Sequence, residues 1–377
     1  MKKTLIALAL TALPVAAMAD VVLYGQIKGG VGVTGGASVT STEWDKNTVN
    51  GGSTTAHYKS KDKSGTITQM EDYGSRIGFK GEEDLGNGLK AIWQVEQRVS
   101  LAGAQVSEGW NTRDTFIGLE GGFGKVRAGY VSDQFNENME TMDIWEYRTG
   151  AGAAARGLAT MTRFDGRQQG VRYDSPNFGG FDFNITQQLA DSATTKEANA
   201  ASVVNQATIV AGGYQQQAWY VKGAAGLYKH QSVDTGDVRD AKLYRVLVGY
   251  DDKKTYVGVS YQYTDGFQGL WEKRFASVNK PLSPTVKTHE AVISASHKIG
   301  RFTPRASYAH GWDETLAGSG RKVNNTSYDQ IIIGSDYAFS KSTIAMTSLG
   351  WIRKPEDYGN NALGDQQGIK HSTVSWG

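Results

Sequence analysis

The sequence contains no cysteine, and only 6 of its 377 residues are proline. Without cysteine, the chain can form neither a disulfide framework nor a thiolate metal site. Its mean hydropathy is −0.43, and after the first residues it has no apolar run of the ~18 residues that a membrane-spanning helix needs. These absences exclude a disulfide scaffold and a bundle of transmembrane helices.

The one strongly apolar segment lies at the beginning of the chain. In residues 1–19 two lysines precede an apolar run, Leu5–Leu13, and a small-x-small cleavage motif ends at Ala19, as in a secretory signal peptide. We therefore expect a signal peptide at 1–19 and a mature single-domain chain at 20–377. That mature chain has 38 basic and 38 acidic residues, a balance that argues against a generally basic nucleic-acid-binding protein.

Aromatic residues and glycine are abundant, with 18 Tyr, 12 Phe, 9 Trp and 47 Gly. Apolar and polar residues alternate in many short segments, for example Val257–Tyr263 and Ala291–Ala295, as they do in strands with two different faces. Exported chains with this composition and alternation are typical of transmembrane β-barrels. Aromatic side chains suited to the two membrane interfaces lie in or beside the expected strands: Tyr24, Trp93, Tyr130, Tyr173, Trp219, Tyr250, Tyr256 and Trp351.

The segments between the expected strands are alternately short and long. The short ones are 81–88, 121–124, 175–180, 215–217, 251–254, 299–302 and 340–342. The long ones are 34–71, 100–111, 132–169, 190–205, 232–241, 264–288, 314–327 and 355–366. Together they predict an all-β fold, a 16-stranded antiparallel transmembrane β-barrel with short periplasmic turns and long outer loops. A barrel of this size encloses an aqueous channel.

The long segment 132–169 is acidic in its first half, and we expect it to fold into the lumen as a constriction loop, because long structureless loops are usually functional. Its carboxylates are Asp133, Glu137, Glu140, Asp143 and Glu146. Four basic residues lie on expected strands, where facing lipid near the midplane would cost an arginine about 2–4 kcal/mol, so they should face the lumen: Lys28, Arg76, Arg113 and Arg127. A carboxylate loop opposite a basic wall would filter ions and small polar solutes.

Other functions have weaker support in the sequence. Gly30-x-Gly32-x-x-Gly35 matches a dinucleotide fingerprint, but no helical period follows it. The six histidines have no metal-ligand spacing, so we expect no metal, no cofactor and no enzyme activity. An outer-membrane enzyme and a surface adhesin or receptor barrel remain alternatives.

Several blocks of the sequence resemble Gram-negative trimeric porins, and neisserial-type porins in particular. They include YGSRIGFKGEEDLGNGLKAIWQVEQ (73–97), TFIGLEGGFGKVRAGY (115–130) and TSYDQIIIGSDYAFSKST (326–343). The resemblance implies a homotrimeric general porin with its third long loop, 132–169, inside each barrel. It also implies wall positions for Arg76, Arg113 and Arg163 or Arg167.

The resemblance further implies that the partners are outer-membrane lipid, surface lipid of the lipopolysaccharide type and the barrel-assembly machinery, with no nucleic acid. The family usually ends in G-L-R-H-K-F, whereas this chain continues after His371 with STVSWG. Two interpretations of this departure are open: Trp376 takes the place of the terminal aromatic residue, or the end of the chain is altered. The departure bears on the efficiency of membrane insertion and not on the fold class.

Overall fold

The computed structural model describes residues 20–49, 52–63, 67–101, 113–137, 142–145, 158, 166–189, 206–232, 238–268, 285–324, 326–360 and 366–376. The predicted signal peptide lies outside these residues. Most of the described chain is β-strand, and its single α-helix is the one-turn segment α2 (Gln134–Glu137). Within the described residues, no helix is both long enough and apolar enough to cross a membrane.

The strands of the first half are β1 (Asp20–Gln26), β2 (Gly29–Val49), β3 (Gly52–Lys63), β4 (Ile67–Asp72), β5 (Arg76–Gly86), β6 (Leu89–Arg98), β7 (Thr115–Gly121), β8 (Gly124–Ser132), β9 (Arg167–Asp174) and β10 (Phe181–Gln188). Those of the second half are β11 (Gln206–Gln216), β12 (Trp219–Ser232), β13 (Val238–Asp251), β14 (Thr255–Gln268), β15 (Thr285–His297), β16 (Phe302–Gly311), β17 (Thr315–Leu316), β18 (Tyr328–Ala338), β19 (Ile344–Asn360) and β20 (Gln366–Trp376).

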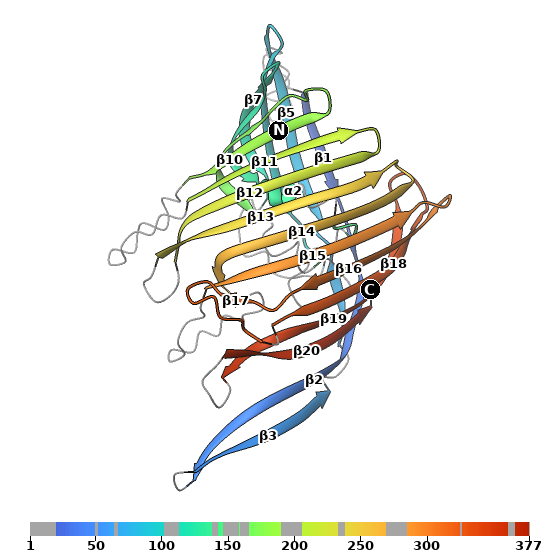
Figure 1. Ribbon diagram of the computed structural model, residues 1–377. Coiled ribbons are helices and arrows are strands. Elements are labelled where there is room, and N and C mark those ends of the chain that lie inside the picture. The colour runs from blue at the N-terminus through green and yellow to red at the C-terminus, as the bar shows by residue number, and fades with distance from the viewer. Residues whose placement is uncertain are drawn as a thin grey trace, which may run out of the picture.

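These segments form one antiparallel sheet in which sequence neighbours pair, and Figure 1 shows β10 to β20 side by side along its curve. Only two residues separate β1 from β2 and only three separate β4 from β5, so each couple is one interrupted strand. The segment β3 is the second arm of a hairpin on β2, and β17 has only two residues. The described chain therefore has the 16 crossing strands that the sequence predicts.

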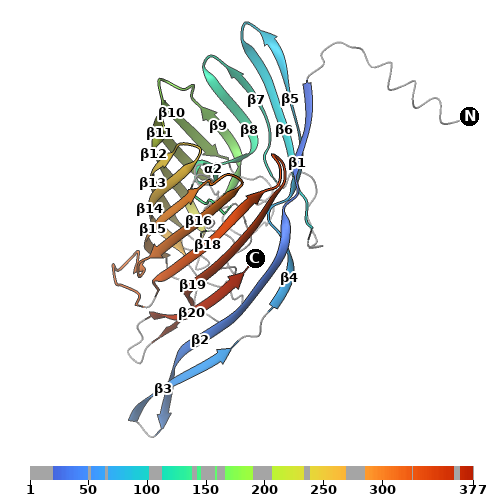
Figure 2. The same ribbon diagram turned by 90° about the vertical axis from the view of Figure 1, so that its right-hand side faces the viewer.

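The two ends of the sheet meet at β20 and β2. Trp376 lies opposite Val33 on β2 and opposite Leu349 on β19, and the pairing with β2 contains a register shift between Gly35 and Ser38. In the described chain β1 pairs with β5 alone. The seam is thus formed along β2 and not along β1. Figure 2 shows β2 continuing from β1 toward the end of the barrel that carries β3.

The alternation of short and long connections is confirmed. All seven predicted short connections join paired neighbours, although the first is tighter than expected, because β5 continues to Gly86 and β6 begins at Leu89. The first long segment is a hairpin, in which β2 and β3 pair from Ser38↔Lys63 to Val49↔Gly52.

Burial alternates along the strands with a period of two. On β13, Leu243 and Leu247 face inward and are at most 1% exposed, whereas Tyr244, Val246 and Val248 face outward and are 46–48% exposed. Apolar side chains that point away from the protein are expected where lipid is the surrounding solvent. The outward face is the lipid-facing side of a transmembrane sheet.

Two of the aromatic residues expected at the interfaces point into the barrel instead. The Tyr24 hydroxyl donates a hydrogen bond to Glu96 Oε2 (3.0 Å), and Tyr256 is 9% exposed and packs with Met142. Trp219 fits the prediction, because it is 62% exposed and its ring lies 5.1 Å from that of Tyr250 at a short turn.

The buried apolar core lies inside the barrel, where residues of the 132–169 segment pack on the inner wall. One cluster surrounds Met142, Trp145 and Leu158, and its wall residues are Tyr73, Tyr220, Leu247, Tyr256, Val292, Ala309, Tyr328 and Ile332. A second cluster surrounds Phe135, and its wall residues are Ala207, Ile209, Tyr228, Ala241 and Leu243. The described residues of the segment therefore lie inside the barrel, as predicted, and Figure 2 shows α2 within the curve of the sheet.

Candidate functional site: a charged constriction

The 132–169 segment enters the lumen at the end of β8, where side chains fix its first residues. Ser132 Oγ donates to the Asp114 carboxylate (2.7 Å to Oδ1), and Gln168 Nε2 donates to Asp133 Oδ2 (3.2 Å). The backbone N–H of Asp133 donates to the carbonyl of Gly166 (3.1 Å), so the two ends of the segment are joined. Asp133 is 1% exposed, and it holds the base of the loop rather than facing the channel.

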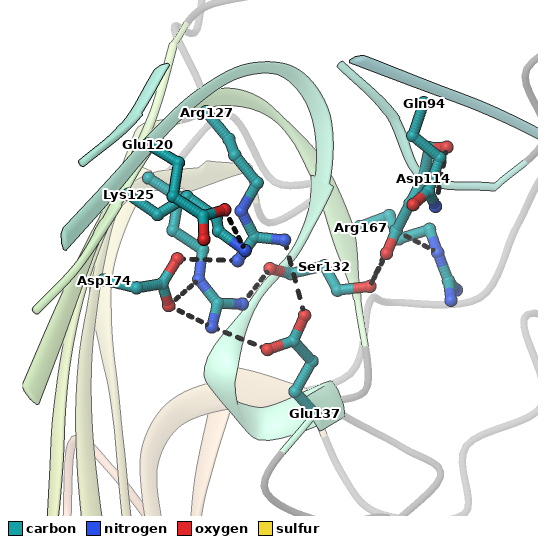
Figure 3. Close-up of polar contacts among 10 residues, drawn as sticks. Gln94, Asp114, Glu120, Lys125, Arg127, Ser132, Glu137, Arg167 and Asp174 are labelled. Carbon is teal, nitrogen blue, oxygen red and sulfur yellow. Dashed lines mark hydrogen bonds and ion pairs between the residues drawn. The ribbon is translucent and has the colours of Figure 1, made fainter. Parts of the chain in front are cut away.

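Four charged residues at this base, which we call the loop-base cluster, neutralise one another: Arg127, Arg172, Asp174 and Glu137. Arg172 Nη2 lies 2.6 Å from both Glu137 Oε2 and Asp174 Oδ1, and Arg127 Nη2 lies 2.7 Å from Asp174 Oδ2. Arg172 also donates through Nη1 to the carbonyl of Ser132 (2.8 Å). Figure 3 shows Glu137 pointing up from α2 toward Arg127 and Asp174 on the wall.

A second set of charges is called here the wall cluster: Arg76, Arg113, Arg167, Glu96 and Asp114. Arg76, Glu96 and Arg167 are on β5, β6 and β9, whereas Arg113 and Asp114 come directly before β7. Arg113 pairs with Glu96 Oε1, Arg76 Nε lies 3.6 Å from Glu96 Oε2, and Arg167 Nε lies 2.6 Å from Asp114 Oδ1. The positive charges of Arg167 and Arg76 both act on Arg113, so the three guanidinium groups are close together. Three cations and two carboxylates leave the wall cluster with one excess positive charge.

The arginines of the two clusters differ individually in their access to water. The Arg76 side chain is 30% exposed, whereas Arg113 and Arg167 are each 11% exposed and Arg172 is 3% exposed. An exposed charge at a narrow passage acts on passing ions at separations below the Debye length, about 8 Å at physiological salt. Arg76 is therefore the wall arginine best placed to act on a solute.

Farther along, arginines of the opposite wall hold the backbone of the segment. Arg245 Nη1 donates to the carbonyl of Phe135 (3.2 Å), and its guanidinium lies 5.3 Å from the Phe135 ring centre. Arg305 donates to the carbonyl of Ile144 and lies 5.0 Å from the centre of the Trp145 ring system. Charge-assisted hydrogen bonds and cation–π contacts are both strong away from bulk water, so these arginines fix the course of the loop.

Asp143 has a structural position inside the loop. It is 8% exposed, and its carboxylate accepts the backbone N–H of Trp145 (3.2 Å) and that of Leu158 (3.3 Å). It thereby joins two parts of the segment that both pack on the wall. Of the predicted acidic set, Glu137 is the described member with substantial exposure, 39%.

The predicted basic wall is brought together only in part. Arg76, Arg113 and Arg167 meet in the wall cluster, and Arg127 lies in the loop-base cluster. Lys28 lies in the break between β1 and β2, where its backbone N–H donates to Ser75 Oγ (2.9 Å). The remaining predicted residues, Glu140, Glu146 and Arg163, lie outside the described residues.

The sequence analysis missed the residues that hold this site together: Glu96, Asp114, Arg172, Arg245 and Arg305. A signal was present for the arginines, because the cost of facing lipid applies to every arginine on a crossing strand. Glu96, Arg172 and Arg245 are on inward positions of alternating segments. Applied to every crossing strand, the same argument would have identified Arg172, Arg245 and Arg305 as residues that face the lumen.

The chain matches the family model of Gram-negative porins over residues 45–375. It is 39% identical over 369 residues to the major outer membrane protein P.IB of Neisseria sicca, with 94% of each chain covered. It is 36% identical over 380 residues to the protein of that name from Neisseria lactamica, covering 98% of this chain and 99% of the relative.

Solved structures with the same fold include an anion-selective porin from Comamonas acidovorans, with a TM-score of 0.65 and 19% identity over 95% of this chain and 98% of that one. Salmonella typhi OmpF in complex with daunomycin gives a TM-score of 0.57 and 18% identity, over 95% of this chain and 97% of that one.

Proposed function

Because this chain belongs to the Gram-negative porin family and is an outer-membrane channel, we propose that the 132–169 loop and the wall cluster together form its charged constriction. The pore passes ions and small hydrophilic solutes by diffusion. One side of the constriction is the loop, held on the inner wall through Phe135 and Trp145. The other side is the wall cluster, with Arg76 as its most exposed cation.

The observation that carries this proposal is the unequal charge balance of the two clusters. The loop-base cluster pairs two arginines with two carboxylates, whereas the wall cluster has three arginines for two carboxylates. Fixed charge in a narrow, wet passage concentrates ions of the opposite sign. The wall cluster therefore favours anions, and the neighbour of like fold from Comamonas acidovorans is named as anion-selective.

A reversal-potential measurement in a planar bilayer under a salt gradient tests this proposal. Replacing Arg76 and Arg113 by glutamine should move the reversal potential toward cation preference, because the wall cluster then keeps one arginine beside two carboxylates. The matched control is Lys298→Gln with Arg301→Gln, which removes the same two positive charges from exposed positions between β15 and β16. Equal reversal potentials for the double variant and the control would place the constriction elsewhere.

From its membership of this family we also propose the oligomeric state of the chain and its surroundings in the membrane. The working unit is a homotrimer of single-domain barrels, inserted by the barrel-assembly machinery and surrounded by outer-membrane lipid, including surface lipid of the lipopolysaccharide type. Closed-point-group homo-oligomers are the usual state of oligomeric proteins. Conductance that disappears in three equal steps per inserted unit supports the trimer, and single independent steps contradict it.

A further inference from the structure

A groove of about 450 Å³ lies on the outward face of strands β11 to β14, away from the channel. Its sides are large residues whose side chains point outward and are 40–46% exposed: Val210, Tyr244, Val246 and Tyr261. Between them the sheet has only small outward residues, Gly212, Gly223 and Ala225. The size lies within the roughly 300–1,000 Å³ that is usual for ligand clefts.

The small residues create the groove, and no neighbouring side chain fills it. Gly223 and Gly212 lie opposite each other on paired strands, and Ala225 lies opposite both Val210 and Tyr244. A Cβ atom added to Gly223 would meet only the carbonyl oxygen of Arg245, at 3.9 Å. A larger residue would thus fit at position 223 without displacing the backbone.

Lysines cross the outer edge of this face, on the side of the long loops. Lys242 and Lys229 are exposed and point outward, two residues beyond Tyr244 and four beyond Ala225 along their strands. At about 3.3 Å per residue these steps correspond to roughly 7 and 13 Å. The groove therefore leads from the apolar belt to basic side chains at headgroup level.

The carboxylates of this edge do not cancel the lysines. Asp265 lies directly opposite Lys242, but its carboxylate is bridged at 3.6 Å by Lys287 on the next strand. Asp240 is the other exposed acid nearby. Three lysines and two aspartates leave an excess positive charge where a lipid phosphate would lie.

We propose that this face is a binding site for one phosphate-bearing lipid of the outer leaflet, with an acyl chain in the groove and a phosphate on Lys229 and Lys242. The apolar walls and glycine floor fit a hydrocarbon chain, and the excess charge at one end fits an anionic head. This inference depends on the outer-membrane location of the chain and not on the proposed constriction, so each can fail without the other.

Native mass spectrometry of the delipidated protein, titrated with diphosphoryl or monophosphoryl lipid A, tests the site. Gly223→Leu fills the groove. It should weaken the binding of the first, most tightly bound lipid about tenfold for both diphosphoryl and monophosphoryl lipid A, since each buried methylene contributes substantially to lipid binding. Ala306→Leu is the matched control, because Ala306 is an exposed residue on β16, away from the groove. Heat-modifiable electrophoretic mobility confirms that each variant is folded.

Replacing Lys229 and Lys242 by glutamine tests the headgroup part of the site without altering the groove. The double variant should lose affinity for diphosphoryl lipid A by about fivefold for each lysine and should no longer distinguish it from the monophosphoryl form. Equal lipid binding by Gly223→Leu and Ala306→Leu would overturn the proposal that the groove holds an acyl chain. If the lysine variant still prefers diphosphoryl to monophosphoryl lipid A as the wild type does, Lys229 and Lys242 do not bind the phosphate.

Discussion

The indole Nε1 of Trp145 donates a hydrogen bond of 2.9 Å to Ser307 Oγ, although 162 residues separate the two along the chain. Trp145 is 0% exposed inside the barrel, and Ser307 is on the inner face of β16. Arg305, on the same strand, lies against the Trp145 ring and also binds Asp336 on β18. The internal loop is thus fixed to the wall farthest from its own base.

Trp145→Ala should loosen the loop and increase the current noise of the open channel. Replacing a buried tryptophan by alanine typically costs about 3–5 kcal/mol, and here the loss falls on the packing of the loop rather than on the strand ladder. Single-channel recording measures the noise. Trp219→Ala is the control, because Trp219 is 62% exposed on the outer face, and a similar increase in both variants would contradict a specific role for Trp145.

Ser307→Ala keeps the Trp145 ring but removes the acceptor of its hydrogen bond, together with the contact between Ser307 Oγ and Ser294 Oγ (2.8 Å), and should give a smaller effect. Leaving the buried indole N–H without a partner costs roughly 1–3 kcal/mol, so we expect noise between that of the wild type and that of Trp145→Ala. Trp145→Phe combined with Ser307→Ala removes donor and acceptor together. If the double variant is as noisy as Trp145→Ala, packing of the ring is not what holds the loop.

Asp143→Asn should disturb the shape of the loop more than the charge of the pore. The buried carboxylate accepts hydrogen bonds from two backbone N–H groups, one on each oxygen. The amide of asparagine has one acceptor oxygen and cannot keep both hydrogen bonds, at a cost of about 1–3 kcal/mol. Conductance and noise should change, with little shift of the reversal potential. A large shift of the reversal potential at unchanged conductance would instead show that Asp143 faces the ion path.

Glu137→Gln, in contrast, should change the charge of the pore more than the shape of the loop. Glu137 is 39% exposed and pairs with Arg172 and Arg127, so its neutralisation leaves the loop-base cluster with an excess positive charge. The reversal potential in a salt gradient should move toward anions. Arg172 keeps Asp174 as a partner, so the sheet should remain folded, as checked by the heat-modifiable band.

Asp313, in the loop between β16 and β17, should make that loop sensitive to acid. Partial burial raises the pKa of its carboxyl, but the hydrogen bond from the Ser327 N–H (2.8 Å) and the ion pair with Lys322 (3.2 Å) outweigh burial and lower the pKa overall. Because the pKa is lower in the folded loop, the stabilisation is present above the unfolded value of about 3.9 and is lost as the pH falls through that value and below it.

Hydrogen–deuterium exchange of the Ser327 amide, corrected for the intrinsic rate, measures this effect. Protection should fall between pH 6 and pH 3 in the wild type. In the Asp313→Asn variant, the protection of the Ser327 amide should be low at both pH values. Equal pH dependence in the two proteins would show that another group controls the loop.

Much of the fold could be predicted from the sequence because a strand that faces lipid has a period of two. Alternation on segments such as β13 and β14, together with glycine-rich turns, was enough to predict the number of strands. The inward position of Arg76 and Arg113 followed from the cost of placing a cation in lipid. Both predictions rest on local rules that each residue obeys independently.

The contacts of the internal loop could not be predicted in this way. Phe135 and Trp145 are in a segment without any period, and their partners Arg245 and Arg305 are 110 and 160 residues away. Nothing local distinguishes the buried Asp143 from the exposed Glu137, since both are acids in one acidic run. Their roles depend on which backbone groups and which arginines the closed sheet brings near them.

The distance in sequence between Trp145 and its partners also determines when the pore takes its final shape during biogenesis. Strands β8 and β9 can pair early, because their contacts with the loop base are nearby in sequence, whereas contacts between distant residues form late and slowly. Arg305, Ser307 and Asp336 become available only when β16 and β18 are in place. The narrow aperture is therefore a late product of folding, and a barrel arrested before β16 would lack the strand that holds Trp145.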